Sequence, residues 1–182
     1  SKIGKLTVAL NDEEILELER LKEQGEANGV PGLEILDPSE MHKIQPGVEG
    51  VGALWSPTSG IVCPYGLTIA LARCARQNGV DFHLSWEVAR IFREESGFLL
   101  ENSFGEELEA SVIINAAGLF ADRIARMAGI EEYTLYPCRG EYYVLDKRLD
   151  GTLKTLIYPA PRKNEPGLGI HLTPTVDGNI LI

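Results

Sequence analysis

Cysteine is scarce in this 182-residue sequence, and long apolar runs are missing. Its cysteines, Cys63, Cys74 and Cys138, are odd in number and show no C-x-x-C spacing, so the sequence suggests neither a disulfide framework nor a zinc site. Reduced thiols in a cytoplasmic protein fit this pattern best. No window holds the roughly 18 consecutive apolar residues that a membrane-spanning helix needs. The sequence therefore predicts no transmembrane segment.

Basic residues are also fewer than acidic residues. The chain has 17 Lys and Arg residues against 27 Asp and Glu residues, which gives a formal net charge of -10, and the basic residues are scattered. Because binding to nucleic acid depends on a basic face, nucleic acid is not expected as a partner. The apolar share of 44% and the charged share of 24% are those of a globular protein, which excludes a wholly disordered or collagen-like chain.

Both ends of the sequence look like cut ends. It lacks an initiator Met and starts almost at once with the strand-like run 3–10. It stops at Ile182, shortly after the turn-like Asp177-Gly178-Asn179. Because a natural domain seldom ends part-way along a strand, we interpret residues 1–182 as a central fragment of a longer protein. A short natural C-terminal strand is the alternative.

The first third of the chain predicts a helix followed by irregular structure. Asn11 can cap a helix in which Glu14 is the third residue, and Asn28-Gly29 can end it. Proline and glycine are frequent over 31–64, which favours short strands and loops. Neither pattern points to a particular chemistry.

A second helix and a long strand are expected next. Pro64 can open the helix and Asn78-Gly79 can close it, with Cys74 on its apolar side and therefore in the core. From Val80 to Val88 apolar and polar residues alternate, which predicts a strand over 80–92. Further strands are expected over 98–101 and around Leu108, and together they would form a meander.

The remainder of the chain mixes a buried strand, a helix and more strands. The continuous apolar run 112–115 is typical of a strand buried on both faces, and the next helix carries Ile124 and Met127. Strands are also expected over 140–145, 155–158 and 169–173. The fold class that these elements predict is α+β, a mixed α/β chain with an antiparallel portion.

Small residues stand between the predicted strand 112–115 and the helix that follows it. Ala116, Ala117 and Gly118 would let a ligand approach the backbone closely, and the positive end of a helix favours an anion. Tight packing at a strand-to-helix turn is the alternative explanation for this pattern. The order of the elements around this motif favours the functional interpretation.

The order of these elements, with the motif Asn-Ala-Ala-Gly-x-x-Ala-Asp at 115–122 and Tyr-x-x-Arg-Gly-Glu-Tyr-Tyr at 136–143, resembles the FAD-dependent oxidoreductases of the D-amino-acid oxidase (DAO) type. The resemblance covers nearly the whole chain. Within that superfamily, residues 139–143 and the segment 169–175 with Asp177-Gly178 look like L-2-hydroxyglutarate dehydrogenases and bacterial glycerol-3-phosphate dehydrogenases.

This resemblance implies FAD as the cofactor of the full-length protein. It implies an antiparallel-sheet substrate domain with helices at about 1–60 and 133–182, and an incomplete FAD-binding portion at about 61–132. The family's G-x-G-x-x-G turn for FAD is not in this sequence. The residues that would lie near the cofactor are Val88, Ala116, Ala117, Gly118 and Asp122.

Oxidation of an alcohol on a flavin requires a base for the hydroxyl proton and a cation for an anionic substrate. His171 is the candidate catalytic base, because an imidazole changes its charge near neutral pH. Arg139 is the candidate for holding the anion. Tyr142 and Tyr143 would point to opposite faces of a strand, so at most one lines a pocket. Tyr142 and Tyr158 are the further substrate-binding candidates. The alternative for His171 is a structural histidine, and the alternative for Arg139 is a surface salt bridge.

The sequence thus favours an FAD-dependent dehydrogenase that oxidises a small anionic secondary alcohol, either glycerol 3-phosphate or L-2-hydroxyglutarate, by hydride transfer to flavin. Its expected partners are that substrate and an electron acceptor that the sequence does not identify. One alternative is an FAD-dependent amine oxidase of the glycine or sarcosine type. The other is a non-catalytic module that binds an acidic metabolite.

Overall fold

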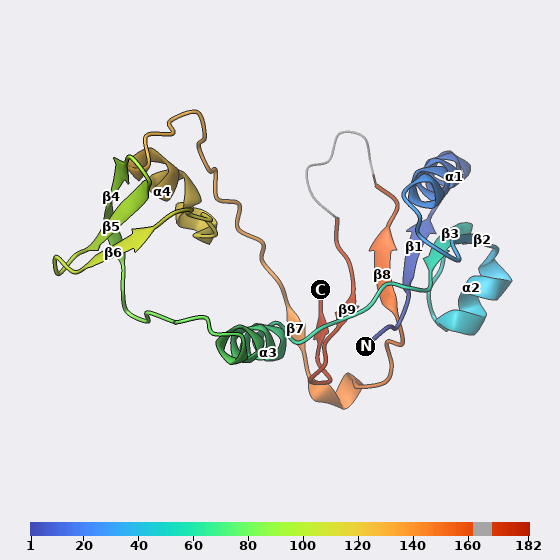
Figure 1. Ribbon diagram of the computed structural model, residues 1–182. Helices are drawn as coiled ribbons and strands as arrows, with labels where there is room; N and C mark the ends of the chain where they lie inside the picture. Colours follow the sequence, from blue (N-terminus) through green and yellow to red (C-terminus); the bar gives the residue numbers. More distant parts are fainter. Residues whose placement is uncertain (162–168) are drawn as a thin grey trace. The chain divides into compact units, whose positions relative to one another are not determined.

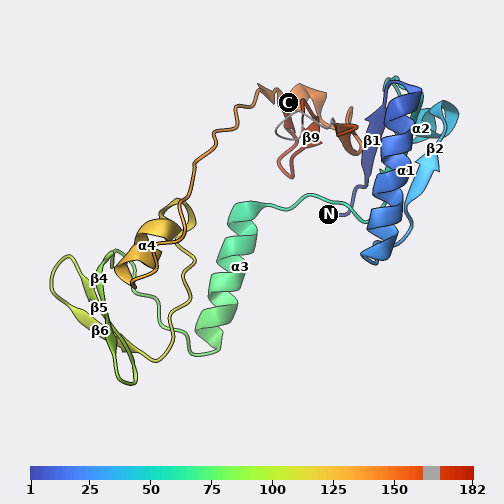
Figure 2. The same ribbon diagram turned by 90° about the horizontal axis from the view of Figure 1, so that it is seen from above.

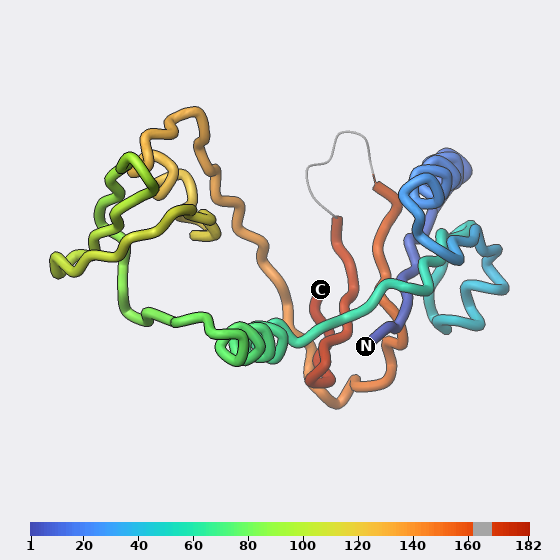
Figure 3. Tube along the Cα trace, in the orientation of Figure 1, coloured from blue at the N-terminus to red at the C-terminus, as the bar shows by residue number. Residues whose placement is uncertain are grey.

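The computed structural model describes residues 1–161 and 169–182, and these form two compact units. The first unit contains Ser1–Ala72 and Glu141–Ile182, and the second contains Arg73–Gly140. The chain leaves the first unit once and returns to it once (Figure 3). The assignment of these units to a substrate domain and an FAD-binding portion stays a prediction.

Helices and antiparallel sheets together confirm the predicted mixed α+β class (Figure 1). The helices are α1 (Asp12–Ala27), α2 (Pro38–Ile44), α3 (Pro64–Gln77) and α4 (Ala121–Met127), with 3-10 turns at Gly118–Phe120 and Lys147–Leu149. The strands of the first unit are β1 (Lys5–Ala9), β2 (Glu34–Leu36), β3 (Gly52–Ser56), β7 (Val144–Leu145), β8 (Leu156–Pro159), β9 (Thr173–Pro174) and β10 (Ile180–Leu181). Those of the second unit are β4 (Val88–Glu94), β5 (Gly97–Asn102) and β6 (Glu107–Ala110). Among the described helices, none is long and apolar enough to cross a membrane.

The main sheet of the first unit has the strand order β2-β3-β1-β8. Its pairs are antiparallel except for β1 and β8, which run parallel. Successive strand residues point to opposite faces, and both faces are buried. One cluster joins Val8 and Ala53 to Met41 of α2, and the other joins Ala9 and Leu54 to Leu18 of α1. Figure 2 shows α1 lying along this sheet.

The predicted ends of α1 are confirmed. The Asn11 side chain accepts a hydrogen bond of 3.0 Å from the Glu14 N–H, and the helix is followed by Gly29 at φ +79°. These signals are local, because a cap and the residue that it satisfies are neighbours in sequence. The interpretation of 31–64 as strands and loops was incomplete, since this segment also forms α2. There Asp37 and Glu40 form a capping box, with Pro38 in the first helical position.

Gln45 ties the end of α2 to the segment that leads into β8. Its buried side chain accepts a 2.7 Å hydrogen bond from the Lys154 N–H and donates a 3.0 Å bond to the Thr152 carbonyl. Both bonds span more than a hundred residues of sequence. The start of β8 is therefore fixed against the main sheet before Tyr158 is reached.

Thr155 is the residue before β8, and it is buried. Its side chain is 1% exposed, and Oγ1 has no hydrogen-bond partner among the described residues. A buried hydroxyl without a partner costs stability, so we expect Thr155→Val to raise the free energy of unfolding by about 1 kcal/mol. Urea unfolding would measure the change.

The control for that substitution is Thr155→Ser. Serine keeps the hydroxyl and loses the buried methyl group, so it should lower the free energy of unfolding. A valine variant that is less stable than the original protein would contradict the assignment, and would indicate that the hydroxyl is satisfied in solution.

The second unit contains the expected meander, with the strand order β4-β5-β6. The turn after β5 is held by Asn102, which is 2% exposed and accepts hydrogen bonds of 2.9 Å from the N–H groups of Phe104 and Glu106. An ion pair between Arg90 and Glu101 links β4 to β5. The prediction of strands around 98–101 and Leu108 is confirmed.

The strand predicted over 80–92 is wrong in its first part, because β4 begins only at Val88. Leu84 is 82% exposed, and Ser85 takes a left-handed conformation at φ +59° that an extended strand does not contain. The Phe82 ring instead lies beside Arg76, whose Cζ is 5.5 Å from the centroid of the Phe82 ring. Alternation identifies residues that can share a face, but a strand also needs a neighbour with which to exchange backbone hydrogen bonds.

The buried strand predicted over 112–115 is also wrong. Residues 112–117 form no strand, and Val112 and Ile114 are 74% and 88% exposed. No strand in the described part of the chain lies beside this run to pair with it. Cys74, expected in the core, is exposed on α3, which has no fully buried residue. In both places the sequence shows an apolar surface, whereas burial requires a second surface to cover it.

Strands near the C-terminus are shorter than predicted. The expected strand 140–145 is reduced to β7, and 169–173 is represented by β9 and a single bridge at Leu172. The turn at Asp177-Gly178-Asn179 does connect β9 to β10, with a 2.8 Å hydrogen bond from the Thr175 N–H to the Asn179 carbonyl. The bridge between Ile157 and Leu172 sets the register that places His171 next to β8.

Candidate functional site

His171 and Tyr158 face each other across two paired segments of the first unit. An antiparallel bridge joins Ile157 to Leu172, with reciprocal backbone hydrogen bonds of 3.0 and 2.9 Å. Because the bridge is antiparallel, Tyr158, which follows Ile157, is opposite His171, which precedes Leu172, and their side chains lie on the same face. The rings of Tyr158 and His171 are accordingly stacked, with centroids 4.3 Å apart and an interplanar angle of 13°.

Tyr142 completes an aromatic surround for the same histidine. Its ring meets the His171 ring edge to face, with centroids 5.8 Å apart and an interplanar angle of 78°. Tyr142 comes from the segment before β7, where Tyr143 pairs with Ile182 through hydrogen bonds of 2.8 and 2.9 Å. Tyr143 is 80% exposed, so of these two tyrosines it is Tyr142 that contacts His171.

A backbone carbonyl fixes the proton on the His171 ring. Nδ1 lies 2.9 Å from the Gly169 carbonyl oxygen. A carbonyl can only accept, so Nδ1 must carry the hydrogen, and the neutral ring presents Nε2 as a proton acceptor. Gly169 has φ +67°, and a Cβ there would lie 2.7 Å from Pro159 Cγ. Only glycine therefore places this carbonyl without strain or overlap.

Lys5 is a member of this cluster that sequence reasoning missed. Its Nζ lies 5.5 Å from the centroid of the Tyr158 ring, within the range of a cation–π contact. We call Lys5, Tyr142, Tyr158 and His171 the His171 cluster. It combines a proton acceptor, a cation and aromatic walls. These groups are suited to a small molecule with a hydroxyl and a negative charge.

Arg139 belongs to the second unit, where it is exposed. Its role in holding a substrate anion stays a prediction.

A hollow of about 650 Å³ at the start of α1 is less suitable for an anion than the His171 cluster. Glu13, Glu14 and Glu17 line it together with Arg20, which pairs with Glu17 at 2.6 Å. Carboxylates in this position would repel an anionic ligand.

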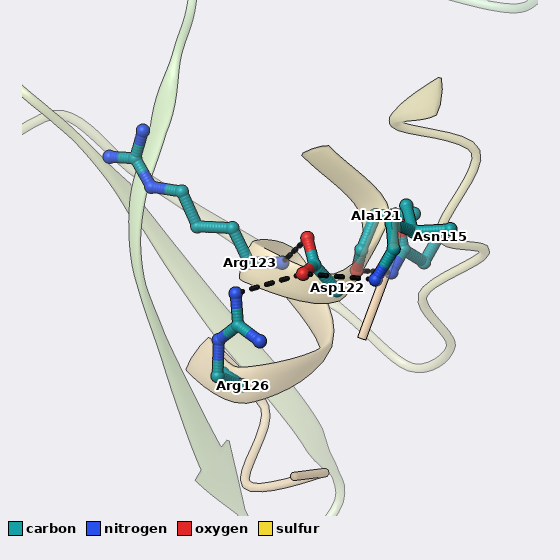
Figure 4. A network of polar contacts seen from close by, with 6 residues as sticks. Asn115, Ala121, Asp122, Arg123 and Arg126 are labelled. Atoms are coloured by element: carbon teal, nitrogen blue, oxygen red, sulfur yellow. Dashed lines mark hydrogen bonds and ion pairs between the residues drawn. The ribbon is translucent and has the colours of Figure 1, made fainter. Parts of the chain in front are cut away.

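Asn115 and Asp122 organise the small-residue segment of the second unit (Figure 4). The Asn115 amide donates to the Ala121 carbonyl at 2.7 Å, and its oxygen accepts from the Ala117 N–H at 3.3 Å. Asp122 accepts from the backbone N–H of Arg123 at 2.8 Å and from Arg126 Nη2 at 3.0 Å. These bonds hold residues 115–118 against the start of α4.

The pKa of Asp122 lies below the ordinary value for aspartate. The main cause is a 3.3 Å hydrogen bond from the backbone N–H of Leu135, and the donors from Arg126 and Arg123 act in the same direction, while burial opposes them. Hydrogen bonds to a carboxylate favour its charged form. Asp122 thus joins α4 to the segment around Leu135, and both of its oxygens have donors from this chain.

The lowered pKa of Asp122 should make the stability of the second unit depend on pH in the acid range. A carboxylate with a lowered pKa in the folded state contributes stability above its unfolded pKa of about 3.9, and this contribution is lost as the pH falls through the folded value. We expect Asp122→Asn to lower the melting temperature of the second unit at pH 7 and to flatten its decline below about pH 4. Fluorescence of Trp86 in a Trp55→Phe background would follow that unit.

Asp81→Asn provides the matched control for this substitution, because Asp81 is an exposed aspartate of the same unit. It should leave both the melting temperature and its acid dependence unchanged. Equal acid dependence in the original protein and in Asp122→Asn would contradict the role assigned to the Asp122 hydrogen bonds.

The residues predicted to lie near a cofactor are small and accessible. Ala116 and Gly118 are exposed, and Gly118 has φ +56° with nothing within 4 Å of the place where a Cβ would be. Val88 is half-buried at the start of β4, beside an irregularity in its pairing with β5. Open backbone at 116–118 fits the close approach of an extended, negatively charged cofactor. The Asp122 carboxylate, which has its own donors, fits a positioning role.

The comparison with protein families identifies the class. The model of the FAD dependent oxidoreductase family (DAO) matches residues 1–182. This match defines the class of protein as a flavin-dependent oxidoreductase. The chain belongs to the DAO family of FAD-dependent oxidoreductases, as the motifs at 115–122 and 136–143 predicted, and FAD is the cofactor of the full-length protein.

Two of the relatives carry the names of the two predicted groups. The chain is 39% identical to a glycerol 3-phosphate dehydrogenase of Caloramator mitchellensis, over 100% of this chain and 38% of the relative. It is 34% identical to the L-2-hydroxyglutarate dehydrogenase of Escherichia coli (strain K12), over 98% of this chain and 42% of the relative. The chain thus spans about two fifths of the length of these relatives.

A solved structure supports the same assignment. The L-alpha-glycerophosphate oxidase of Mycoplasma pneumoniae, dithionite-reduced with FAD bound, matches with a TM-score of 0.84 and 28% identity. The match covers 100% of this chain and 48% of that protein. The described residues therefore share the fold of this flavoprotein, and the chain belongs to the same class.

Proposed function

We propose that the protein oxidises a small anionic secondary alcohol, with glycerol 3-phosphate and L-2-hydroxyglutarate as the favoured substrates. The observation that carries this proposal is the His171 cluster. There the Gly169 carbonyl holds the Nδ1 hydrogen and leaves Nε2 as a proton acceptor, beside two aromatic rings. The two groups of relatives named above support the choice of substrates.

The proposed reaction converts the secondary alcohol to a ketone. His171 Nε2 takes the hydroxyl proton, and the carbinol carbon loses a hydride as the carbon–oxygen double bond forms. FAD, when bound, supplies the acceptor for that hydride. A second electron acceptor, of unidentified nature, then returns the cofactor to its oxidised state.

Tyr142 and Tyr158 would bind the substrate as the walls on either side of the base. Tyr158 also restrains the imidazole plane through stacking, which keeps Nε2 in a constant direction. Arg139 is proposed to hold the substrate anion. All three roles are properties of this chain's own residues and can be tested individually.

The cofactor is proposed to lie along the small-residue segment of the second unit. Ala116, Ala117 and Gly118 would offer open backbone to it, with Val88 nearby in the family arrangement. Asp122 would act by holding this segment in place through its bonds to Leu135 and Arg126. This division separates residues that approach the cofactor from one that positions them.

Anaerobic flavin bleaching tests the proposal. The protein, extended to the length of its relatives and loaded with FAD, is titrated separately with glycerol 3-phosphate and with L-2-hydroxyglutarate. Loss of the oxidised flavin band with one compound supports the proposal and selects that substrate. Reduction by glycine or sarcosine, with neither alcohol active, would replace it with the amine-oxidase alternative. A protein that binds an acidic metabolite without flavin reduction would favour the non-catalytic alternative.

A further inference from the structure

We propose that Lys5 binds the negatively charged end of the substrate whose hydroxyl faces His171. This inference rests on the proposed function and adds Lys5, a residue of the first unit, as a second cation for the anion that Arg139 is also proposed to hold. It predicts a preference for substrates with an anionic group a few bonds from the alcohol. Lys5 would then determine substrate specificity, and His171 would perform the proton transfer.

The register of the main sheet places Lys5 beside the proposed base. In the parallel pair of β1 and β8, Lys5 lies opposite Leu156 and Thr7 lies opposite Tyr158. Lys5 and Tyr158 therefore project from the same face. β8 is flanked by β1 on one side and by the Leu172 segment on the other, so Tyr158 stands between Lys5 and His171.

Lys5 is a half-buried cation in an acidic chain, yet no ion pair is formed by it within residues 1–161 and 169–182. Elsewhere in the first unit Lys22 pairs with Glu26 at 2.6 Å and Arg20 pairs with Glu17. The contact of Lys5 is with the face of an aromatic ring, which leaves ammonium hydrogens for another acceptor. Among the described residues, therefore, the Lys5 ammonium keeps hydrogens that a ligand anion could accept.

The separation of the two groups suits a short substrate. The imidazole centroid lies 4.3 Å from the Tyr158 centroid, and Lys5 Nζ lies 5.5 Å from the same point. The base and the ammonium are thus no farther apart than these two distances combined. Because the Tyr158 ring stands between the two groups, a substrate that contacts both would pass along the edge of this ring. With a hydrogen bond of roughly 2.8 Å at each end, a hydroxyl and an anionic group on a chain of a few atoms can span such a separation.

Lys5→Met removes the charge while it keeps much of the side-chain volume. In the FAD-loaded protein of full length, we expect it to raise KM for the active dianionic substrate by about 10- to 100-fold with a much smaller change in kcat, because it removes a bond made equally in the ground and transition states. Lys5→Arg, which keeps the charge, should recover most of the affinity. Lys2→Met, which removes an exposed lysine of the same segment, should have no effect.

A charge-deleted analogue separates recognition from a general loss of structure. L-2-Hydroxybutyrate lacks the distal carboxylate of L-2-hydroxyglutarate, and glycerol lacks the phosphate. Their binding, measured as competitive inhibition, should change less than threefold in Lys5→Met. As a measurement that needs no variant, KM of the original protein for the dianion should rise with ionic strength more steeply than the inhibition constant of its analogue.

The outcomes distinguish this inference from the function on which it rests. If the original protein reduces its flavin with the dianion and Lys5→Met has the same KM, Lys5 does not bind the anion, and the proposed function stands. Equal losses for the dianion and its analogue would also overturn the inference, because they indicate a structural role. If the original protein is reduced by neither alcohol, both proposals fail together.

Discussion

His171→Gln should lower kcat/KM for the active substrate by about 10² to 10⁴-fold in the FAD-loaded protein, because general-base catalysis contributes a factor of this size. Glutamine has no group that accepts and releases a proton near neutral pH. The stacking on Tyr158 and the hydrogen bond to the Gly169 carbonyl would be altered in the same variant. Stopped-flow reduction of the flavin under anaerobic conditions measures the effect.

Two further variants separate proton transfer from packing. Tyr158→Phe keeps the ring that stacks on His171 and should change the rate of flavin reduction much less than His171→Gln does. His83→Gln removes an exposed histidine of the second unit that contacts Trp86, and should leave the rate unchanged. The kcat/KM profile of His171→Gln should lose the pH dependence that a histidine base produces. A variant that keeps both the rate and this pH dependence would exclude His171 as the base.

The contrast between correct and incorrect strand predictions has a physical basis. The cap at Asn11 and the meander of β4, β5 and β6 follow from interactions between residues close in sequence, and both were predicted. The alternation at Val80–Val88 and the apolar run at 112–115 also have the right local composition. Neither forms a strand as predicted, because strand formation depends on a partner that no local pattern specifies.

The His171 cluster could be predicted only in part. His171 and Tyr142 lie in motifs that resemble a known family, and Tyr158 was a further candidate outside these motifs. Their proximity, however, depends on one antiparallel bridge between Ile157 and Leu172, and no sequence pattern specifies that bridge. Because of this bridge, the Tyr158 ring stacks on the His171 ring.

Lys5 could not have been found from local sequence. A lysine near the start of an alternating strand is unremarkable, and the residues that give it meaning are far away in the chain. The parallel pairing of β1 with β8 brings Lys5 to Tyr158, and the Gln45 bonds hold the segment just before β8. Sites assembled from distant strands are visible only after the register is known.

Gly4 supports this arrangement from the residue before Lys5, and its replacement should have a large effect on stability. Gly4 is buried with φ +74°, and a Cβ there would lie 1.9 Å from Trp55 Cη2. Its carbonyl accepts a 3.2 Å hydrogen bond from the Leu156 N–H, and its N–H donates a 2.9 Å bond to the Ser59 carbonyl. Alanine would be strained by the backbone angle and would also collide with the indole ring.

We expect Gly4→Ala to lower the free energy of unfolding of the first unit by about 2–5 kcal/mol, the combined cost of left-handed strain and overpacking. Gly29→Ala is the matched control, since Gly29 has a similar φ of +79° but nothing within 4 Å of its Cβ position, so it should cost only about 1–2 kcal/mol. Urea unfolding followed by Trp55 fluorescence, in a Trp86→Phe background, measures both. Equal losses in the two variants would mean that Trp55 moves aside at no cost. A larger loss in Gly4→Ala would show that the packed Trp55 ring leaves no room for a side chain at the residue before Lys5, where the Gly4 carbonyl bonds to the Leu156 N–H.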